Sequence, residues 1–410
     1  MLVNGMRRTS VPTLAAGAAR AGRPRAGRAV VPSVIVASRG GVPGPPSSAC
    51  CSGDRGRRYG AAMCDGHASR AEVAQGVPRP AEGPAVDPIP LEPVDEVRIT
   101  TLVENVFDAL LTGDERVSRV GLGAGRATAA QFVGGAADVG LMAEHGFAAL
   151  VTVRRGTATT SLLFDAGLSP DALVVNAGRV GADLDVVQGI VLSHGHPDHA
   201  GGLAGLAGRR GTRALPMVLH PAAWTRRRFA VPGGDTRELP TLSPRALAGE
   251  GFELVERRVP SVLLDGAVLI TGEVDRTTEY ERGMPPAHQA WTGSAWEHDA
   301  AVVDDQALVV HVKDKGLVVL TGCGHAGAVN IVRHAQRLTG VPELYALLGG
   351  LHLGGPYFEP VIPPTVAALR ELAPAVLVPG HCTGWRAQHA LAAALPDAWI
   401  APSAGSTYTL

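Results

Sequence analysis

The chain has 410 residues, of which 46% are hydrophobic, and its formal net charge is -1. This apolar content suffices for a large core, and no run reaches the ~18 to 20 apolar residues that a membrane span needs. Residues 1–60 hold ten arginines and one acid, which leaves 27 of the 37 basic and 37 of the 38 acidic residues to the remainder. An acidic body argues against a nucleic-acid partner, because phosphates need basic surface. We therefore expect a small-molecule substrate and no membrane partner.

Residues 1–93 form an Arg-, Ala-, Gly- and Pro-rich extension without sustained periodicity, which is typical of a disordered segment. Its Arg-rich, acid-poor start fits an organelle transit peptide. Alternatively, the true start lies downstream, for instance at Met63. The folded domain is predicted over residues 96–410. Five cysteines make no disulfide framework in a chain this long, so we expect a reducing compartment, the cytoplasm unless the extension directs import.

The domain is predicted to begin with strands. Apolar and polar residues alternate over residues 97–103, and two further strands follow at 148–153 and 160–164. The third strand ends in Asp165, followed by Ala-Gly. A carboxylate at such a strand end often orients a metal-binding histidine from behind; a turn-capping role for Asp165 is the alternative. A helix is predicted next, over residues 171–180.

A polar cluster follows the next predicted strand, at residues 190–192. His194 and His196 are two residues apart in an extended segment, so they point the same way and can grip one ion. Asp198 and His199 follow a turn and can face a second site. Imidazole and carboxylate are ligands of zinc, iron or manganese. Three histidines and an aspartate within six positions predict a metal site rather than a loop with incidental histidines.

The middle of the chain is less regular. We predict a strand at 216–219, an exposed short helix carrying the arginines of 226–228, and a hairpin over 262–271. Residues 272–299 are polar and rich in turn formers. A loop of this length in a compact domain is more often functional than not, so we expect it to overhang the pocket.

Three later predicted strands each end in a glycine-flanked histidine: His325, His352 and His381. The strands are placed at 316–321, 344–348 and 375–378, with helices at 326–338, 365–372 and 386–395 and a last strand at 398–401. In α/β sheets the chemistry collects at the loops that follow the strands. We therefore expect these histidines in one crevice with the polar cluster. His325 and His381 are predicted to bind metal, and His352 to bind metal or else to bind or protonate the substrate.

The sequences HPDHAGGL after His194, GLVVLTGCGH up to His325, GGLHL around His352 and GHCTG around His381 resemble the metallo-β-lactamase-fold superfamily. The subgroup they resemble is named for 7,8-dihydropterin-6-methyl-4-(β-D-ribofuranosyl)-aminobenzene-5′-phosphate synthase. The resemblance spans residues 97–410 and implies an α/β fold, a four-layer αββα sandwich. It also implies a set of metal ligands with Asp165 behind them. The implied ligands are His194, His196, Asp198, His199 and His381.

One position departs from the superfamily pattern. Most members have a bridging aspartate where this chain has Cys323. The glycines on both sides of Cys323 indicate a tight turn, so we prefer His325 as the ligand and place Cys323 beside the ligands. Whether two metals bind equally well is therefore left open.

The resulting hypothesis is a metal-dependent hydrolase that uses metal-bound hydroxide on an ester or phosphoester. The cofactor would be one or two divalent ions, zinc in the first place, with manganese, iron or magnesium as alternatives. Asp198 could orient the hydroxide proton, and His352 would protonate the leaving group or hold an oxygen of the substrate, which can be anionic. The alternatives are the pyrophosphate-releasing transferase that the resemblance implies, a non-haem iron redox enzyme, and a metal-binding protein without catalysis.

Overall fold

The computed structural model describes residues 87–211, 214–231 and 233–410. The predicted disorder of residues 1–86 lies outside these ranges. Residues 87–93, which the sequence placed in the same extension, pack onto the domain. The Ile89 amide donates to the Leu338 carbonyl at 2.7 Å, and the Glu92 amide donates to the Gly266 carbonyl at 2.9 Å. The packed chain therefore begins before residue 96, in a segment too short to show periodicity.

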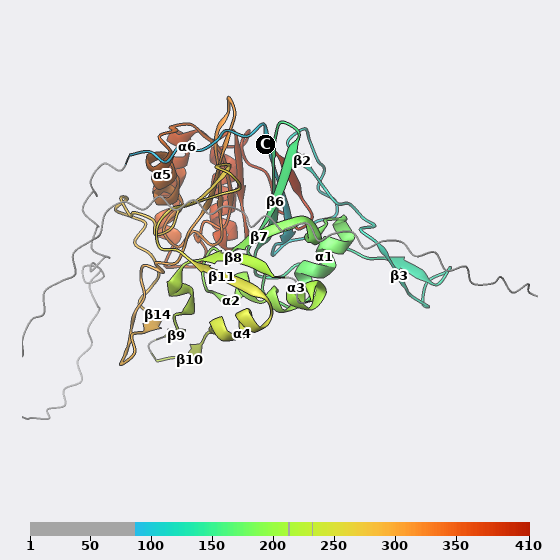
Figure 1. The fold of residues 1–410 in the computed structure, drawn as a ribbon, viewed down its shortest axis with the longest axis horizontal. Helices are drawn as coiled ribbons and strands as arrows, with labels where there is room; N and C mark the ends of the chain where they lie inside the picture. Colours follow the sequence, from blue (N-terminus) through green and yellow to red (C-terminus); the bar gives the residue numbers. More distant parts are fainter. Residues whose placement is uncertain (1–86, 212–213, 232) are drawn as a thin grey trace, which may run out of the picture. The chain divides into compact units, whose positions relative to one another are not determined.

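An eight-stranded mixed sheet runs in the order β11-β8-β7-β6-β5-β1-β20-β2. Figure 1 shows β6, β7, β8 and β11 as neighbours. Strands β6, β7, β8 and β11 are parallel neighbours, so their carboxyl ends lie at one edge, where β7 delivers the polar cluster. The strands are β1 (Glu96–Val103), β2 (Val117–Ser118), β5 (Ala148–Arg155), β6 (Ala158–Phe164), β7 (Val187–Val191), β8 (Leu215–Leu219), β11 (Phe252–Glu256) and β20 (Thr407–Thr409).

A six-stranded sheet runs in the order β12-β13-β16-β17-β18-β19. Its last three strands are parallel, so the loops that carry His325, His352 and His381 all leave the same edge. The strands are β12 (Ser261–Leu263), β13 (Val268–Ile270), β16 (Leu308–Val312), β17 (Gly316–Thr321), β18 (Leu344–Gly349) and β19 (Val376–Pro379). The first two form the predicted hairpin.

Three apolar clusters divide the domain into four layers. One cluster lies between the two sheets, with Phe164 and Leu320 among its members. A second cluster lies between the larger sheet and the helices that cover it. A third cluster lies between the smaller sheet and a different set of helices. The larger sheet is covered by α1 (Ala172–Val180), α3 (Leu203–Arg210) and α4 (Pro244–Gly249), and the smaller by α5 (Ala328–Thr339), α6 (Ile362–Leu372) and α7 (Trp385–Ala394). The predicted αββα sandwich is confirmed.

The remaining elements are short. They are α2 (Pro197–Ala200), β3 (Arg126–Thr128), β4 (Ala136–Asp138), β9 (Arg227–Ala230), β10 (Thr236–Glu238), β14 (His288–Trp291), β15 (Trp296–His298), and the 3-10 helices η1 (Leu184–Val186), η2 (Pro221–Trp224), η3 (Glu359–Val361) and η4 (His381–Thr383). Strands β10, β9, β14 and β15 form a separate four-stranded sheet. Among the described residues, no helix has the length and apolarity of a membrane span.

Two sequence predictions are wrong. Residues 226–228 do not form an exposed helix: Arg227 begins β9 and is only 3% exposed, because it pairs with buried acids described below. Residues 398–401 form no strand and keep only an isolated bridge from Trp399 to Leu377. The last strand is β20, which pairs with β1 and β2 at the far side of the larger sheet.

Candidate metal centre

The predicted site residues meet where the carboxyl ends of β7, β17, β18 and β19 come together. The Nε2 atoms of His194 and His325 are 3.2 Å apart, although 131 positions separate them in the sequence. The ring centroids of His199 and His381 are 5.1 Å apart. Nearly all of these side chains are buried. The two sheets thus bring four distant segments to one point, and the donors there fall into two groups.

The first group consists of His194, His196 and His325 and is called the three-imidazole group. Nε2 of His194 lies 3.1 Å from Nδ1 of His196 and 3.2 Å from Nε2 of His325. Zinc–nitrogen bonds of about 2.0–2.1 Å would place tetrahedral ligand atoms about 3.3–3.4 Å apart. Burial lowers the pKa of all three rings, that of His196 to about 3. Three neutral imidazoles at this spacing fit a divalent cation.

The outer partners of two rings decide which nitrogen is free to bind. The Ser193 hydroxyl donates to Asp165 at 2.8 Å, so its oxygen accepts from Nδ1–H of His194 at 2.9 Å. Nδ1 of His325 lies 3.2 Å from the sulfur of Met284, which can only accept. Both rings therefore carry their hydrogen on Nδ1, and the lone pair on Nε2 faces the group.

His288 is a member of the site that the sequence did not reveal. It lies on β14, fully buried, with Nδ1 3.0 Å from the Asp299 carbonyl. A carbonyl only accepts, so this Nδ1 carries the hydrogen, and Nε2 of His288 accepts from Nε2–H of His196 at 3.1 Å. His196 is left with a bare Nδ1 turned toward His194. His288 thus sets the tautomer that a metal-binding His196 needs.

The second group consists of Asp198, His199, Cys323 and His381 and is called the mixed group. Nε2 of His199 is 3.4 Å from Asp198 Oδ2 and 3.2 Å from Cys323 Sγ. The sulfur is in turn 3.4 Å from Nε2 of His381. The sequence placed Cys323 beside the ligands, whereas the structure puts its sulfur among them. A carboxylate, two imidazoles and a thiol fit a borderline or soft divalent cation.

Asp165 stands behind the mixed group, where the sequence expected it. Its carboxylate accepts from the Ser193 amide at 2.7 Å and lies 2.7 Å from Nδ1 of His199. Burial alone would lower the pKa of His199, but Asp198 and Asp165 on its two sides raise it well above the usual range. Without a cation the ring holds a proton between the two carboxylates. A bound cation would displace that proton from Nε2.

His352 lies at the edge of the centre and outside both groups. Its ring centroid is 4.2 Å from that of His325, and its φ of 43° is a left-handed conformation that is uncommon for a non-glycine residue. Its donor atoms, with those of Cys323 and Cys382, form a further cluster within 4.8 Å. Both cysteines are free and buried, and Cys382 donates to the Cys323 carbonyl at 3.2 Å.

A buried ion network supports the loop between His194 and His196. The amide of Gly195 donates to Asp304 at 2.8 Å, and Arg227 bonds both Asp304 and Asp299. A side chain at Gly195 would place its Cβ 2.2 Å from the Ala223 carbonyl oxygen, so only glycine fits. This network explains why Arg227, which the sequence assigned to the surface, is buried.

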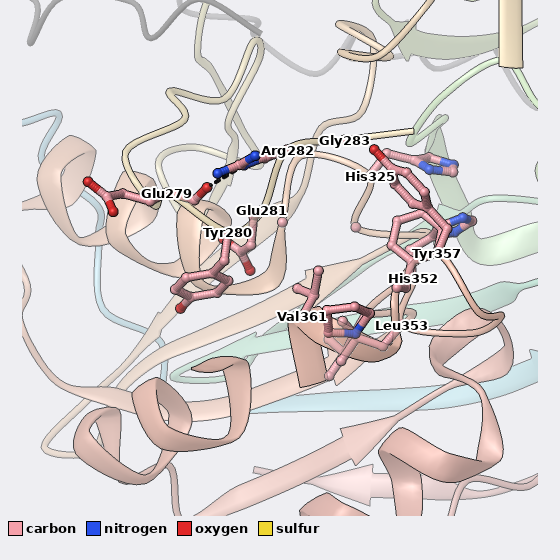
Figure 2. Close-up of a pocket in the computed structure, with 15 residues that line it drawn as sticks. Glu279, Tyr280, Glu281, Arg282, Gly283, His325, His352, Leu353, Tyr357 and Val361 are labelled. Carbon is pink, nitrogen blue, oxygen red and sulfur yellow. Dashed lines mark hydrogen bonds between the residues drawn. The ribbon is translucent and has the colours of Figure 1, made fainter. Parts of the chain in front are cut away.

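The segment predicted to overhang the pocket is fixed in place. Arg276 donates to the His325 carbonyl at 3.0 Å, and the Asn330 side chain accepts from the Thr277 amide at 2.8 Å. Glu281 accepts the amides of Val329 and Asn330 at the start of α5, at 2.9 Å each. Together with the loop after β18, this segment encloses a cavity of about 540 Å³ beside His325 and His352 (Figure 2).

Comparisons with known proteins agree with this geometry. Residues 144–321 match the model of the metallo-beta-lactamase superfamily. The chain is 26% identical over 251 residues to the 7,8-dihydropterin-6-methyl-4-(beta-D-ribofuranosyl)-aminobenzene-5'-phosphate synthase of Methanocaldococcus jannaschii, an alignment that covers 60% of this chain and 83% of that protein. It is 27% identical over 252 residues to an uncharacterized protein of the same organism. That alignment covers 60% of this chain and 86% of the other protein.

A solved structure shares the fold. The crystal structure of a metal-dependent hydrolase of the beta-lactamase superfamily superposes with a TM-score of 0.55 at 24% identity, covering 77% of this chain and 98% of that one. The motif, the two sheets and the matched family model therefore agree: residues 144–321 belong to a metallo-β-lactamase superfamily domain.

Proposed function

We propose that the protein is a metal-dependent hydrolase acting on an ester or phosphoester of a small molecule. The observation that carries this proposal is the pair of adjacent donor groups, of which the three-imidazole group turns its lone pairs inward and lies beside a cavity. Divalent ions bound there would lower the pKa of a bound water to about 7 and polarise a substrate oxygen. The superfamily is one of metal-dependent enzymes, which supports catalysis over a purely structural metal site.

Different residues of the site would bind the metal ions, orient the attacking water and contact the substrate. The three-imidazole group would hold one ion, and the mixed group would hold the other. Asp198 also lies where its free oxygen can accept a hydrogen bond from an attacking water, because it is the least buried of the donors in its group. His352 lines the cavity and would hold a substrate oxygen or donate a proton to the leaving group. Zinc suits this mixture of nitrogen, oxygen and sulfur donors, with iron and manganese next.

Metal quantification joined to an activity panel of phosphodiesters, lactones and pterin diphosphates tests the proposal. We expect the reconstituted protein to retain at least one equivalent of a transition metal and to hydrolyse part of the panel. His196→Ala should abolish both metal retention at the three-imidazole group and turnover. His389→Ala, an exposed histidine on α7, is the matched control and should change neither. Retention of less than about half an equivalent of metal would contradict the proposal.

A transferase is the second candidate, and the similarity to the synthase favours it. The ions would then assist the loss of pyrophosphate from a dihydropterin diphosphate, and an aminobenzene ribose phosphate would be the acceptor. Product analysis with both substrates separates the two functions. A condensed product with little free hydrolysis product would favour the transferase. Hydrolysis product alone would favour the hydrolase.

A further inference from the structure

The cavity beside His325 and His352 has a wall that is mostly apolar and partly aromatic. It is contributed by the segment before β14 and by the loop and short helix after β18. The apolar and aromatic lining residues include Tyr280, Leu351, Leu353, Tyr357, Phe358 and Val361 (Figure 2). A volume of about 540 Å³ is within the range of sites for drug-sized molecules. The cavity is therefore much larger than a metal site alone requires.

The charged residues of the lining do not equip the cavity to bind an ionic group deep inside. They are Glu279, Glu281 and Arg282. The carboxylate of Glu281 is already used by two amides of α5 and by the Thr278 hydroxyl. Glu279 and Arg282 are exposed at the rim with opposite charges, and Nε of Arg282 donates to the Glu279 carbonyl at 2.9 Å. The interior therefore favours an uncharged group.

The shape of the cavity is set before any ligand arrives. One wall is fastened to α5 through Glu281, and to the metal centre through Met284 and His325. On the other wall, Phe358 packs edge-on against both His352 and Tyr357, at centroid distances of 4.9 and 5.1 Å. Because the cavity is already formed, binding a rigid ligand requires little further ordering of its side chains and loops, and the entropic cost of binding is small.

We propose that this cavity receives an uncharged aromatic substituent of the substrate, the size of one ring or two fused rings. The ester or phosphoester group then lies at the metal centre. Tyr357, Phe358 and Val361 determine this specificity, because they line the cavity and lie outside both donor groups. The inference rests on the proposed hydrolase function and adds the chemical class of its substrate.

Two phosphonates test the inference by binding rather than by turnover. Methylphosphonate and 2-naphthylmethylphosphonate carry the same tetrahedral anion, which resembles the transition state of ester hydrolysis, and they differ only in the aromatic group. Calorimetric titration of the metal-loaded full-length protein should show the naphthyl compound binding at least about tenfold more tightly. The same preference should appear as a lower KM for naphthyl than for methyl esters.

Three variants test whether the preference for the naphthyl phosphonate depends on the cavity. Val361→Trp should fill the cavity and Tyr357→Ala should open its wall, and each should reduce the naphthyl preference to less than about threefold while leaving methylphosphonate binding unchanged. Trp385→Ala removes an aromatic side chain that is 72% exposed outside the cavity, and it should leave the preference intact. Unchanged metal content and circular dichroism would show that each variant is folded.

The outcomes separate the two levels of the proposal. Equal affinity for the two phosphonates, or an unchanged preference in both cavity variants, would overturn the aromatic assignment and leave the hydrolase function standing. If metal-loaded protein bound neither phosphonate and hydrolysed no ester, the hydrolase function itself would be overturned, and the cavity assignment with it.

Discussion

The two donor groups of the centre lie side by side but differ in charge. In the three-imidazole group the outer nitrogens have Ser193, His288 and Met284 as hydrogen-bond partners. The carboxyl group of Asp305, whose pKa is raised to about 7 by burial, lies farther off, 4.0 Å from Nδ1 of His194. In the mixed group the carboxylate of Asp198 is itself a donor, and that of Asp165 stands behind His199. The donors of the three-imidazole group are thus all neutral, whereas the mixed group includes an anionic donor and has a second carboxylate behind it.

This difference implies a division of roles. A dication among neutral imidazoles would keep its full charge and act as the stronger Lewis acid, whereas anionic donors would offset the charge of an ion in the mixed group and bind it more tightly. We therefore expect the mixed group to fill first as metal is added. That expectation addresses whether the two metals bind with equal affinity, which the sequence left open.

Removing the anionic donor should have the largest effect. Asp198→Ala should lower the metal affinity of the mixed group by more than about 100-fold, beyond the range seen when only an outer partner is lost. His194→Ala should weaken the three-imidazole group and leave the first equivalent of metal bound. Competitive titration with a chromophoric chelator measures both. If His194→Ala removed the tighter equivalent instead, the assigned order of filling would be wrong.

The support of the three-imidazole group can be broken at Arg227. Arg227→Met leaves the fully buried charge of Asp304 and the partly buried charge of Asp299 uncompensated, and we expect a loss of about 3–5 kcal/mol in the free energy of unfolding. Urea denaturation monitored by circular dichroism gives the value. The matched control is Arg228→Met, which changes the next residue of β9 and loses a hydrogen bond to Gln289 and a contact with the Trp296 ring. Similar losses in the two variants would contradict the network.

The role of His288 predicts a smaller and more selective effect. His288→Ala removes the acceptor for Nε2–H of His196, and should lower the metal affinity of the three-imidazole group about 10- to 100-fold. The mixed group should be unaffected, which sharpens the distinction between the groups. His288→Gln can still accept a hydrogen bond through its side-chain oxygen and should recover part of the affinity. An equal loss in both groups would indicate general misfolding.

The sequence predicted the parts of the centre that follow regular strands. Residues 316–321 were assigned as a strand from their unbroken apolar run, and β17 has those bounds. The convergence of His325 and His381 on the polar cluster of residues 194–199 followed from the rule that strand ends carry the chemistry. These features depend on local pattern and on one general property of α/β sheets.

The supporting residues could not be found in this way. His288 and Met284 lie in a polar, turn-rich segment without periodicity. They reach the centre because Asn330 and Glu281 fasten that segment to α5 and because β14 pairs with β9. Arg227 stands in a run of three arginines that suggests solvent, and nothing local reveals that Asp304 lies opposite. Pairings between groups 77 positions apart depend on tertiary structure rather than on local preference.

The smallest expected effect concerns Asp275, which ties the segment of residues 272–299 to His334 and Arg337 on α5 at the protein surface. The hydrogen bond from His334, together with Arg337, lowers the pKa of Asp275 to about 2. Because this pKa lies below the unfolded value of about 3.9, the stabilisation is fully present above that value and is lost as pH falls toward 2. Asp275 is 52% exposed, so screening by solvent limits the stabilisation to about 0.5 kcal/mol.

Asp275→Asn should therefore lower the free energy of unfolding slightly at neutral pH, and the difference from wild type should vanish at acidic pH or in high salt. Urea denaturation across that pH range checks both. A large or pH-independent loss would mean that Asp275 does more than pair with its neighbours on α5. A small loss would leave the buried contacts of Glu281 and Asn330 as the main fastening of the segment that supplies Met284 and His288, because those contacts are shielded from solvent.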